Sequence, residues 1–543
     1  MLRLTELKLP LDHPETALRA AIAQRLGVAD GDIAGFTVYR RSYDARKRSA
    51  IALIYTVDVE LRDTLETSAA ETSALESKVV ERGRPHVAPS PDVRYRFVTH
   101  APGTLKSRPV VIGFGPCGLF AALILAQMGF RPIVLERGKA VRERTRDTFG
   151  LWRQAVLDPE SNVQFGEGGA GTFSDGKLWS QIKDPHHYGR KVLEEFVLAG
   201  APEEIMYVSK PHIGTFRLVS MIEKMRATIE SLGGEIRFGA RVEDVRIEDG
   251  RLRGLVLKDG EELPCEHVVL AIGHSARDTF EMLHRRGVYI EAKPFSIGFR
   301  IEHPQSMIDN ARFGAFAGHP LLGAADYRLV HHARNGRGVY SFCMCPGGTV
   351  VAATSEVGQV VTNGMSQYSR NERNANAGLV VGISPTDYPG DPLAGIAFQR
   401  QWERQAFKLG GGDYWAPGQL VGDFVRGRPS KDFGDVQPSY TPGVRLGDLS
   451  TALPDYAIAA IREAIPALDR QLKGFAMHDA VLTGVETRTS SPIRITRGAD
   501  YQSINTRGLY PAGEGASYAG GIYSAAIDGI EVAQALALAM TGD

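Results

Sequence analysis

Residues 110–138 read VVIGFGPCGLFAALILAQMGFRPIVLERG, and this stretch decides the fold of a large part of the chain. A short apolar run meets Gly113, Gly115 and Gly118, and a helical stretch follows. A second apolar run then ends at Glu136. Strand, glycine turn, helix, strand and acid in this order are typical of a dinucleotide site, where the helix N-terminus faces a pyrophosphate and the acid accepts a hydrogen bond from a ribose hydroxyl.

Each glycine of this turn has its own expected role. Gly113 permits the tight turn, Gly115 lets the backbone approach a pyrophosphate, and Gly118 lets the helix pack close to the sheet. The predicted binding segment also includes three neighbours of these residues, Pro116, Cys117 and Arg137.

Composition restricts the class of protein. The chain has 543 residues, with 43% hydrophobic and 23% charged, which is ordinary for a globular protein of two to four domains. Sixty-three basic residues balance sixty-three acidic ones, so no overall field favours nucleic acid or an anionic membrane. Charges interrupt the first residues and no apolar run approaches a membrane span, so we expect neither a signal peptide nor a membrane anchor. Four cysteines in so long a chain indicate a reducing, cytoplasmic setting.

Three further segments carry glycines in patterns that suit a bound nucleotide. The loop 164–177 has polar side chains among its glycines, and its amides can line a phosphate or a ring edge. Strand 268–273 ends at a glycine after a predicted hairpin, 242–247 and 253–257. Segment 508–522 leads into a last helix at about 522–540, whose N-terminus favours negative charge. The candidate cofactor residues in these segments are Gly171, Thr172, Ser174, Asp175, Val242, Gly273, Gly513, Glu514, Gly520, Gly521 and Ile522.

The four elements together resemble the glutathione-reductase-type flavoprotein superfamily. More narrowly, GEGGAGTFSDGKL, SFCMCPGG, GVETRTSSPIRI and YPAGEGASYAGGI resemble a family of mostly uncharacterised bacterial FAD-dependent dehydrogenases, over about residues 108–540. The resemblance implies a bound FAD and a redox role, but no settled substrate. It carries cofactor contacts onto Gly113, Gly115, Gly118, Glu136, Gly273 and Glu514, the last standing where the superfamily usually has Asp.

The predicted fold class is α/β, with three parts. A Rossmann-like FAD-binding domain is expected from residues 108–284 and 496–543, interrupted by an inserted mixed α+β substrate domain, 285–495, with two clear helices near 395–408 and 455–472. Residues 1–98 are expected to form an N-terminal ferredoxin-like α+β domain of order βαββαβ, with a helix at 63–80 and a last strand at 93–98.

The inserted domain supplies candidate catalytic residues, each with an alternative. On a flat strand Cys343 and Cys345 would point to the same side, as a thiol pair near the flavin or as two buried packing residues. Arg488 could hold a substrate anion or pair with Glu486. His274 could act as acid or base, or cap the chain locally.

The sequence thus predicts an FAD-dependent oxidoreductase, a dehydrogenase or reductase that transfers a hydride or an electron pair through flavin N5. Since only one dinucleotide fold is visible, electrons are expected from transient NAD(P)H docking, from another protein or from the substrate. A small-molecule substrate and an electron-donor protein are the expected partners, with no membrane and no metal. The alternatives are a flavin monooxygenase and a flavin-containing RNA-modifying or RNA-binding protein that uses the basic hairpin at 40–48, although nucleic acid is not the expected partner.

Overall fold

A five-stranded parallel sheet lies at the centre of the half of the molecule that contains the motif at 110–138. The computed structural model describes residues 1–62, 76, 79–80, 83–105 and 107–542. The sheet order is β23-β11-β5-β6-β7, so the strand of the first motif lies in the middle. Its strands come from widely separated parts of the chain: β5 (Val110–Ile112), β6 (Ile133–Glu136), β7 (Glu235–Phe238), β11 (Val268–Leu270) and β23 (Leu509–Pro511).

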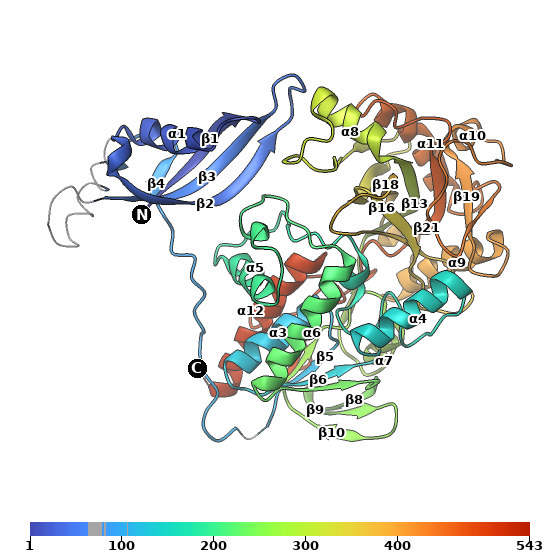
Figure 1. Cartoon of the computed structure of the whole chain (residues 1–543). Helices are drawn as coiled ribbons and strands as arrows, with labels where there is room; N and C mark the ends of the chain where they lie inside the picture. The colour runs from blue at the N-terminus through green and yellow to red at the C-terminus, as the bar shows by residue number, and fades with distance from the viewer. Residues whose placement is uncertain (63–75, 77–78, 81–82, 106, 543) are drawn as a thin grey trace.

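Helices pack on this sheet and against one another (Figure 1). They are α3 (Pro116–Gln127), α5 (Tyr188–Leu198), α6 (Thr215–Ser231) and α12 (Ile522–Thr541). Helices α3 and α12 approach so closely that a Cβ on Gly529 would lie 2.3 Å from the carbonyl oxygen of Cys117. Among the described residues, α12 is apolar and long enough to cross a membrane, yet 72% of its apolar stretch is buried inside the fold.

The predicted hairpin is present beside the parallel sheet. It consists of β8 (Val242–Glu248) and β9 (Arg251–Leu257), and β10 (Glu262–Pro264) adds a third strand. The turn residues Asp249 and Gly250 both have positive φ, 48° and 71°, as a tight hairpin of this kind requires. Helices α4 (Val141–Gln154) and α7 (Arg277–Arg285) lie between this region and the second half of the molecule (Figure 1).

The second half of the molecule is built on a larger sheet. Its order is β14-β15-β18-β13-β21-β19-β20, and its long central strands pair antiparallel. The strands are β13 (Phe295–Pro304), β14 (Val330–His332), β15 (Gly338–Cys345), β18 (Asn374–Ile383), β19 (Ala416–Leu420), β20 (Val444–Leu446) and β21 (Val481–Glu486). Two small antiparallel pairs accompany it, β12 (Ile290–Ala292) with β22 (Ile493–Ile495) and β16 (Gly348–Ala352) with β17 (Thr362–Ser366).

Four helices belong to this half, of which the sequence identified two. Helices α9 (Ala394–Leu409) and α11 (Asp455–Asp469) lie where they were predicted. The shorter α8 (Gln305–Phe313) and α10 (Val421–Arg426) were missed, because segments of about two turns give little periodic signal.

The N-terminal residues form a separate sheet of order β2-β3-β1-β4 (Figure 1). Its elements are β1 (Leu2–Pro10), α1 (Thr16–Leu26), β2 (Ile33–Asp44), β3 (Ala52–Leu61) and β4 (Val87–Pro89). The predicted strand at 93–98 is wrong: the fourth strand lies earlier, and residues 93–98 run without strand pairing. The predicted helix at 63–80 lies mostly outside the described residues.

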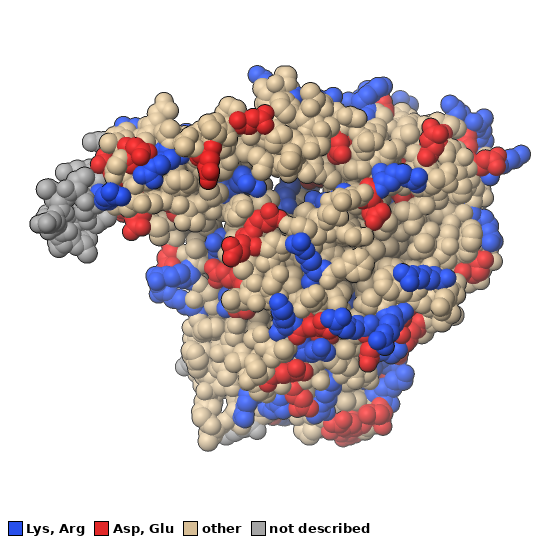
Figure 2. All heavy atoms as spheres, viewed as in Figure 1, with Lys and Arg blue, Asp and Glu red and all other residues tan. Residues whose placement is uncertain are grey.

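The N-terminal sheet contacts the rest of the molecule through the edge of β2. The Arg41 N–H donates to the Tyr207 carbonyl at 2.6 Å, and the Ser209 N–H donates to the Arg41 carbonyl at 2.9 Å. Basic and acidic side chains alternate over the face seen in Figure 2, in agreement with a net charge of zero. Arg46 of the basic hairpin is itself paired with Asp44.

Candidate cofactor and active site

One cavity of about 390 Å³ is lined by all four glycine-bearing segments. We call its two sides the nucleotide wall, formed by residues from the segments 112–117, 135–137, 164–177, 271–276 and 513–525, and the antiparallel wall, formed by Phe342, Cys343, Asn363, Glu486, Arg488 and Thr489. The predicted residues that line the cavity are Gly113, Gly115, Pro116, Cys117, Glu136, Arg137, Gly171, Ser174, Asp175, Val242, Gly273, His274, Cys343, Arg488, Gly513, Glu514, Gly520, Gly521 and Ile522.

Glu136 ties the nucleotide wall together. Its Oε2 accepts the Phe114 N–H at 2.8 Å, and its Oε1 accepts the N–H groups of Gly138 and Gly166, each at 2.9 Å. A carboxylate offers about four lone-pair sites, so one on Oε2 stays available for a ribose hydroxyl. Glu136 therefore fixes two loops, a task that the sequence motif alone did not predict.

The second glycine loop lies directly on the first turn. The Gly168 N–H donates to the Phe114 carbonyl at 2.8 Å. A Cβ on Gly169 would lie 2.7 Å from the Cα of Gly115, so only glycine allows the two backbones this close approach. The loop is therefore part of the cavity wall and not a flexible surface loop.

Sequence reasoning missed the side chain that supports this loop. Arg144 of α4 is fully buried and donates to the carbonyls of Asn162, Val163 and Glu167 at 2.7–2.8 Å. Burial lowers the pKa of Arg144 to about 10, although the charges of Glu136 and Glu167 oppose the shift. An arginine in an otherwise ordinary amphipathic helix gives no sequence signal for such a role.

Two helices begin at the cavity. Helix α3 starts after Gly115 and α12 after Gly521, and no side chain of the described residues caps either N-terminus. A Cβ on Gly521 would meet nothing within 4 Å, so the approach to α12 is open. Uncapped N–H groups and the positive ends of two helix dipoles suit an anionic pyrophosphate and an electron-rich ring. The residues present therefore fit an FAD.

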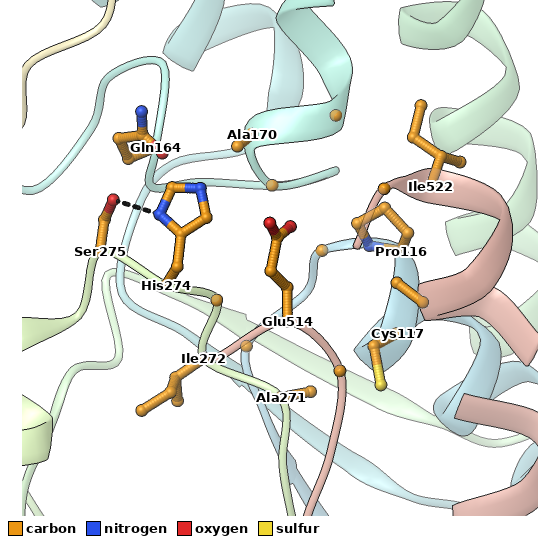
Figure 3. Close-up of a pocket in the computed structure, with 18 of the residues that line it drawn as sticks. Pro116, Cys117, Gln164, Ala170, Ala271, Ile272, His274, Ser275, Glu514 and Ile522 are labelled. Carbon is orange, nitrogen blue, oxygen red and sulfur yellow. Dashed lines mark hydrogen bonds between the residues drawn. The ribbon is translucent and has the colours of Figure 1, made fainter. Parts of the chain in front are cut away.

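Glu514 and His274 come from neighbouring strand ends and lie side by side in the same space (Figure 3). Burial raises the pKa of Glu514 to about 7, with a smaller contribution from Cys343 across the cavity. Burial also lowers the pKa of His274 to about 3, and Arg488 and Arg277 act in the same direction. The lowered pKa keeps the ring neutral, and the contact of His274 Nδ1 with the Ser275 hydroxyl at 2.9 Å holds it locally.

Arg488 has a different partner from the one expected. Its Nε and Nη2 donate to Glu403 of α9 at 3.1 and 3.0 Å, and its Nη1 donates to Ser355 at 2.7 Å. The alternative of a pair with Glu486 is wrong, because Glu486 pairs with Arg300 of β13 instead. Since most of its donors are already engaged, Arg488 is poorly placed to hold a substrate anion.

Glu403 is the centre of a buried ion network behind the cavity. It accepts from Arg277 at 2.8 Å through both carboxylate oxygens as well as from Arg488, and it is fully buried. Burial alone would raise the pKa of Glu403, but the two guanidinium groups outweigh it and hold the pKa well below its usual range.

Three predicted cofactor or catalytic residues do not line the cavity. Gly118 is a packing residue, since a Cβ there would lie 1.9 Å from the Gly113 carbonyl oxygen. Thr172 is buried behind the loop, where its hydroxyl accepts from Arg144. Cys345 is fully buried, and Cys343 alone of the pair reaches the cavity. Asp175 lines the cavity, but its carboxylate binds Arg370 at 2.9 Å and Lys177 at 3.1 Å.

Comparisons with known proteins agree with this geometry. Residues 294–489 match the family described as "FAD-dependent protein, C-terminal domain-like", residues 154–289 match "Flavin containing amine oxidoreductase", and residues 1–60 match a domain of unknown function. The matched families and the cavity define the class: the chain is an FAD-dependent oxidoreductase, and its cofactor is FAD.

A protein of Clostridium beijerinckii described as "Uncharacterized protein" is 48% identical over 541 residues, which cover 98% of each chain. The chain belongs to the same family as this Clostridium protein.

Solved structures give only distant likenesses. Glycine oxidase from Bacillus cereus is 13% identical, with a TM-score of 0.29, over 80% of this chain and 95% of its own. The L-amino acid deaminase from Proteus myxofaciens is 12% identical, with a TM-score of 0.33, over 83% of this chain and 93% of its own.

Proposed function

We propose that the protein is a dehydrogenase or reductase that passes a hydride or an electron pair between flavin N5 and a small substrate at the antiparallel wall. The observation that carries the proposal is that one cavity is lined both by the glycine-bearing segments and by a separate antiparallel sheet. A Rossmann-like FAD domain of residues 108–284 and 496–543, with 285–495 as an inserted substrate domain and 1–98 as a ferredoxin-like domain, is the arrangement we propose, in the manner of the glutathione-reductase-type superfamily.

The chain's own residues hold and orient the reactants. Glu136 would bind the ribose, and the uncapped N-terminus of α3 would bind the pyrophosphate. The N-terminus of α12 would stabilise negative charge on the ring. Bound FAD supplies the capacity to accept and donate an electron pair.

Glu514 is the group best suited to hold or release a proton in this cavity. Its pKa is raised to about 7 by burial, close to the pH at which most enzymes work. His274, whose pKa is lowered to about 3, stays neutral at that pH and can donate or accept a hydrogen bond without changing its charge.

The antiparallel wall suggests what kind of substrate fits. Each of its charged side chains has a partner within the fold: Glu486 has Arg300, and Arg488 has Glu403. A substrate there would be recognised by shape and hydrogen bonds more than by an ion pair. We propose that electrons arrive from transient NAD(P)H, a donor protein or the substrate, in the cytoplasm and without a membrane or nucleic-acid partner.

Anaerobic reduction tests the proposal directly. The purified protein, loaded with FAD, is mixed with NADH, NADPH and a panel of small metabolites, and the visible flavin absorbance is followed. Bleaching by one donor and recovery with one acceptor are expected. A flavin that photoreduction bleaches but that no donor in the panel reduces would contradict the dehydrogenase proposal. Oxygenation of a substrate would favour a monooxygenase instead.

A further inference from the structure

The segment Cys343–Met344–Cys345 departs from a regular strand where it meets the cavity. Strand β15 pairs with β18, and the register shifts between Phe342 and Cys345, so that one extra residue is inserted. Cys343 adopts φ +42°, a left-handed conformation that is uncommon for a residue with a side chain. A bulge of this kind re-aims a side chain, and here it turns Cys343 into the cavity wall.

The bulge also changes the strand geometry on which the objection to a bond between the two sulfurs rests. On a flat strand the two Cα atoms would be about 6.6 Å apart, with parallel Cβ vectors that disfavour a disulfide. The strand is not flat, and the Cys345 thiol folds back to donate to the Cys343 carbonyl at 3.3 Å. The two cysteines are free thiols, Cys345 fully buried and Cys343 partly exposed.

Two cations hold the backbone of the bulge. The Lys177 ammonium donates to the Met344 carbonyl, between the two cysteines. The Arg300 guanidinium donates to the Cys343 carbonyl at 2.9 Å. Both cationic groups are thus fixed beside the sulfurs by hydrogen bonds to the same three-residue segment.

The paired side chains around the bulge carry more positive than negative charge. Three cations gather there, Lys177, Arg300 and Arg370, against two carboxylates, Asp175 and Glu486. The neighbouring Cys345 thiol, with the charges of Lys177 and Arg300, holds the pKa of the Cys343 thiol well below its usual range, although burial opposes this. A nearby positive field of this kind is typical of reactive cysteines.

We propose that Cys343 and Cys345 are a dithiol–disulfide pair that reacts with small disulfides entering the cavity. The Cys343 thiolate attacks one sulfur of the small disulfide, forms a mixed disulfide and releases one thiolate. Cys345 then attacks Cys343 Sγ and its proton passes to the departing sulfur, which forms the internal disulfide and releases the second thiol. The protein pair loses two electrons and the small disulfide gains them, so the exchange balances without another reactant.

The inference deepens the proposed function, because it names a substrate class for the antiparallel wall. It rests on the proposed function for one point, the supply of the electron pair that restores the dithiol after each round. The exchange itself needs only the thiols, so the two can be tested separately.

Oxidised glutathione is the probe, added to the FAD-loaded protein, with peptide mass spectrometry under non-reducing conditions as the readout. The wild type should form the internal Cys343–Cys345 disulfide and release two equivalents of glutathione. Cys345→Ser should stop at a mixed disulfide on Cys343. Cys343→Ser should leave Cys345 unmodified, because that thiol is buried. The buried Cys117 and Cys265 are internal controls and should react at least about tenfold more slowly than Cys343.

Two outcomes would overturn the inference. In one, native Cys343 reacts no faster than Cys117 and Cys265, while all four thiols react in urea. In the other, Cys343→Ser exchanges as fast as the wild type. The flavin absorbance of each sample is recorded alongside: bound FAD that donors reduce, with inert thiols, refutes only the pair. Exchanging thiols in a protein that binds FAD but that no donor reduces would refute the proposed function instead.

Discussion

The two walls of the cavity present different chemical groups. The nucleotide wall consists mainly of backbone amides and glycines, gathered by one carboxylate, Glu136, and two uncapped helix N-termini. The antiparallel wall presents side chains, among them a partly exposed thiol, and its two charged residues, Glu486 and Arg488, are paired with Arg300 and Glu403 behind it. The nucleotide wall suits an anionic cofactor of fixed structure. The antiparallel wall presents side chains, which can be changed to suit a substrate.

The largest expected effect comes from breaking the buried ion network behind the antiparallel wall. Glu403→Gln leaves Arg277 and Arg488 buried without their shared counter-charge. The free energy of unfolding should fall by about 3–5 kcal/mol, measured by urea denaturation. The control is Glu262→Gln, whose pair with Arg246 is exposed and should cost less than about 1 kcal/mol. Equal losses in the two variants would contradict the buried network.

A smaller loss is expected from the corresponding change in the nucleotide wall. Glu136→Gln places an amide NH₂ where backbone N–H groups need an acceptor, which should cost about 1–3 kcal/mol of stability. FAD affinity should fall as well, because the side chain no longer joins the two glycine loops by hydrogen bonds. Glu143→Gln, on the exposed face of α4, should change neither quantity. Unchanged stability and cofactor content in Glu136→Gln would refute the role assigned to this carboxylate.

A substitution in the first glycine turn, at Gly115, tests cofactor binding separately from folding. A Cβ at Gly115 has room, 3.5 Å from the nearest atom, so the methyl groups of Gly115→Val would extend over the N-terminus of α3. FAD affinity should drop at least about tenfold, or about 1.4 kcal/mol, in a titration with apo-protein. Gly382→Val in β18, where a Cβ meets nothing within 4 Å, is the matched control. Equal FAD affinity in both variants would place the pyrophosphate elsewhere.

The smallest expected effect is a pH dependence of stability that arises from His303 of β13. Burial lowers the pKa of His303 from its usual 6.5 to about 4. Below about pH 6.5 the unfolded chain takes up a proton that the folded chain refuses, so this contribution to stability is lost as pH falls toward 4. The wild type should therefore lose stability relative to His303→Asn over that range, by at most about 1.4 kcal/mol per pH unit. A pH-independent difference in unfolding free energy would contradict a buried neutral histidine.

The nucleotide wall could be predicted from the sequence because its information is local. Gly113, Gly115 and Glu136 lie within one strand–helix–strand unit, and their spacing alone indicates the site. Arg488 could not be assigned its partner, because Glu403 lies 85 residues earlier and only the fold brings them together. Alternation predicted a flat strand at Cys343, and the bulge there depends on pairing with β18. The wrong strand at 93–98 has a similar cause, since pairing with β1 selects residues 87–89 instead.

The most direct test of the whole account is the cofactor content of the purified, folded protein. We predict one FAD per chain, seen as the visible absorbance of a bound flavin and identified by mass spectrometry after release. Folded protein that is colourless and takes up no added FAD would contradict the account, because the two helix N-termini and four glycine segments would then line a cavity with another purpose.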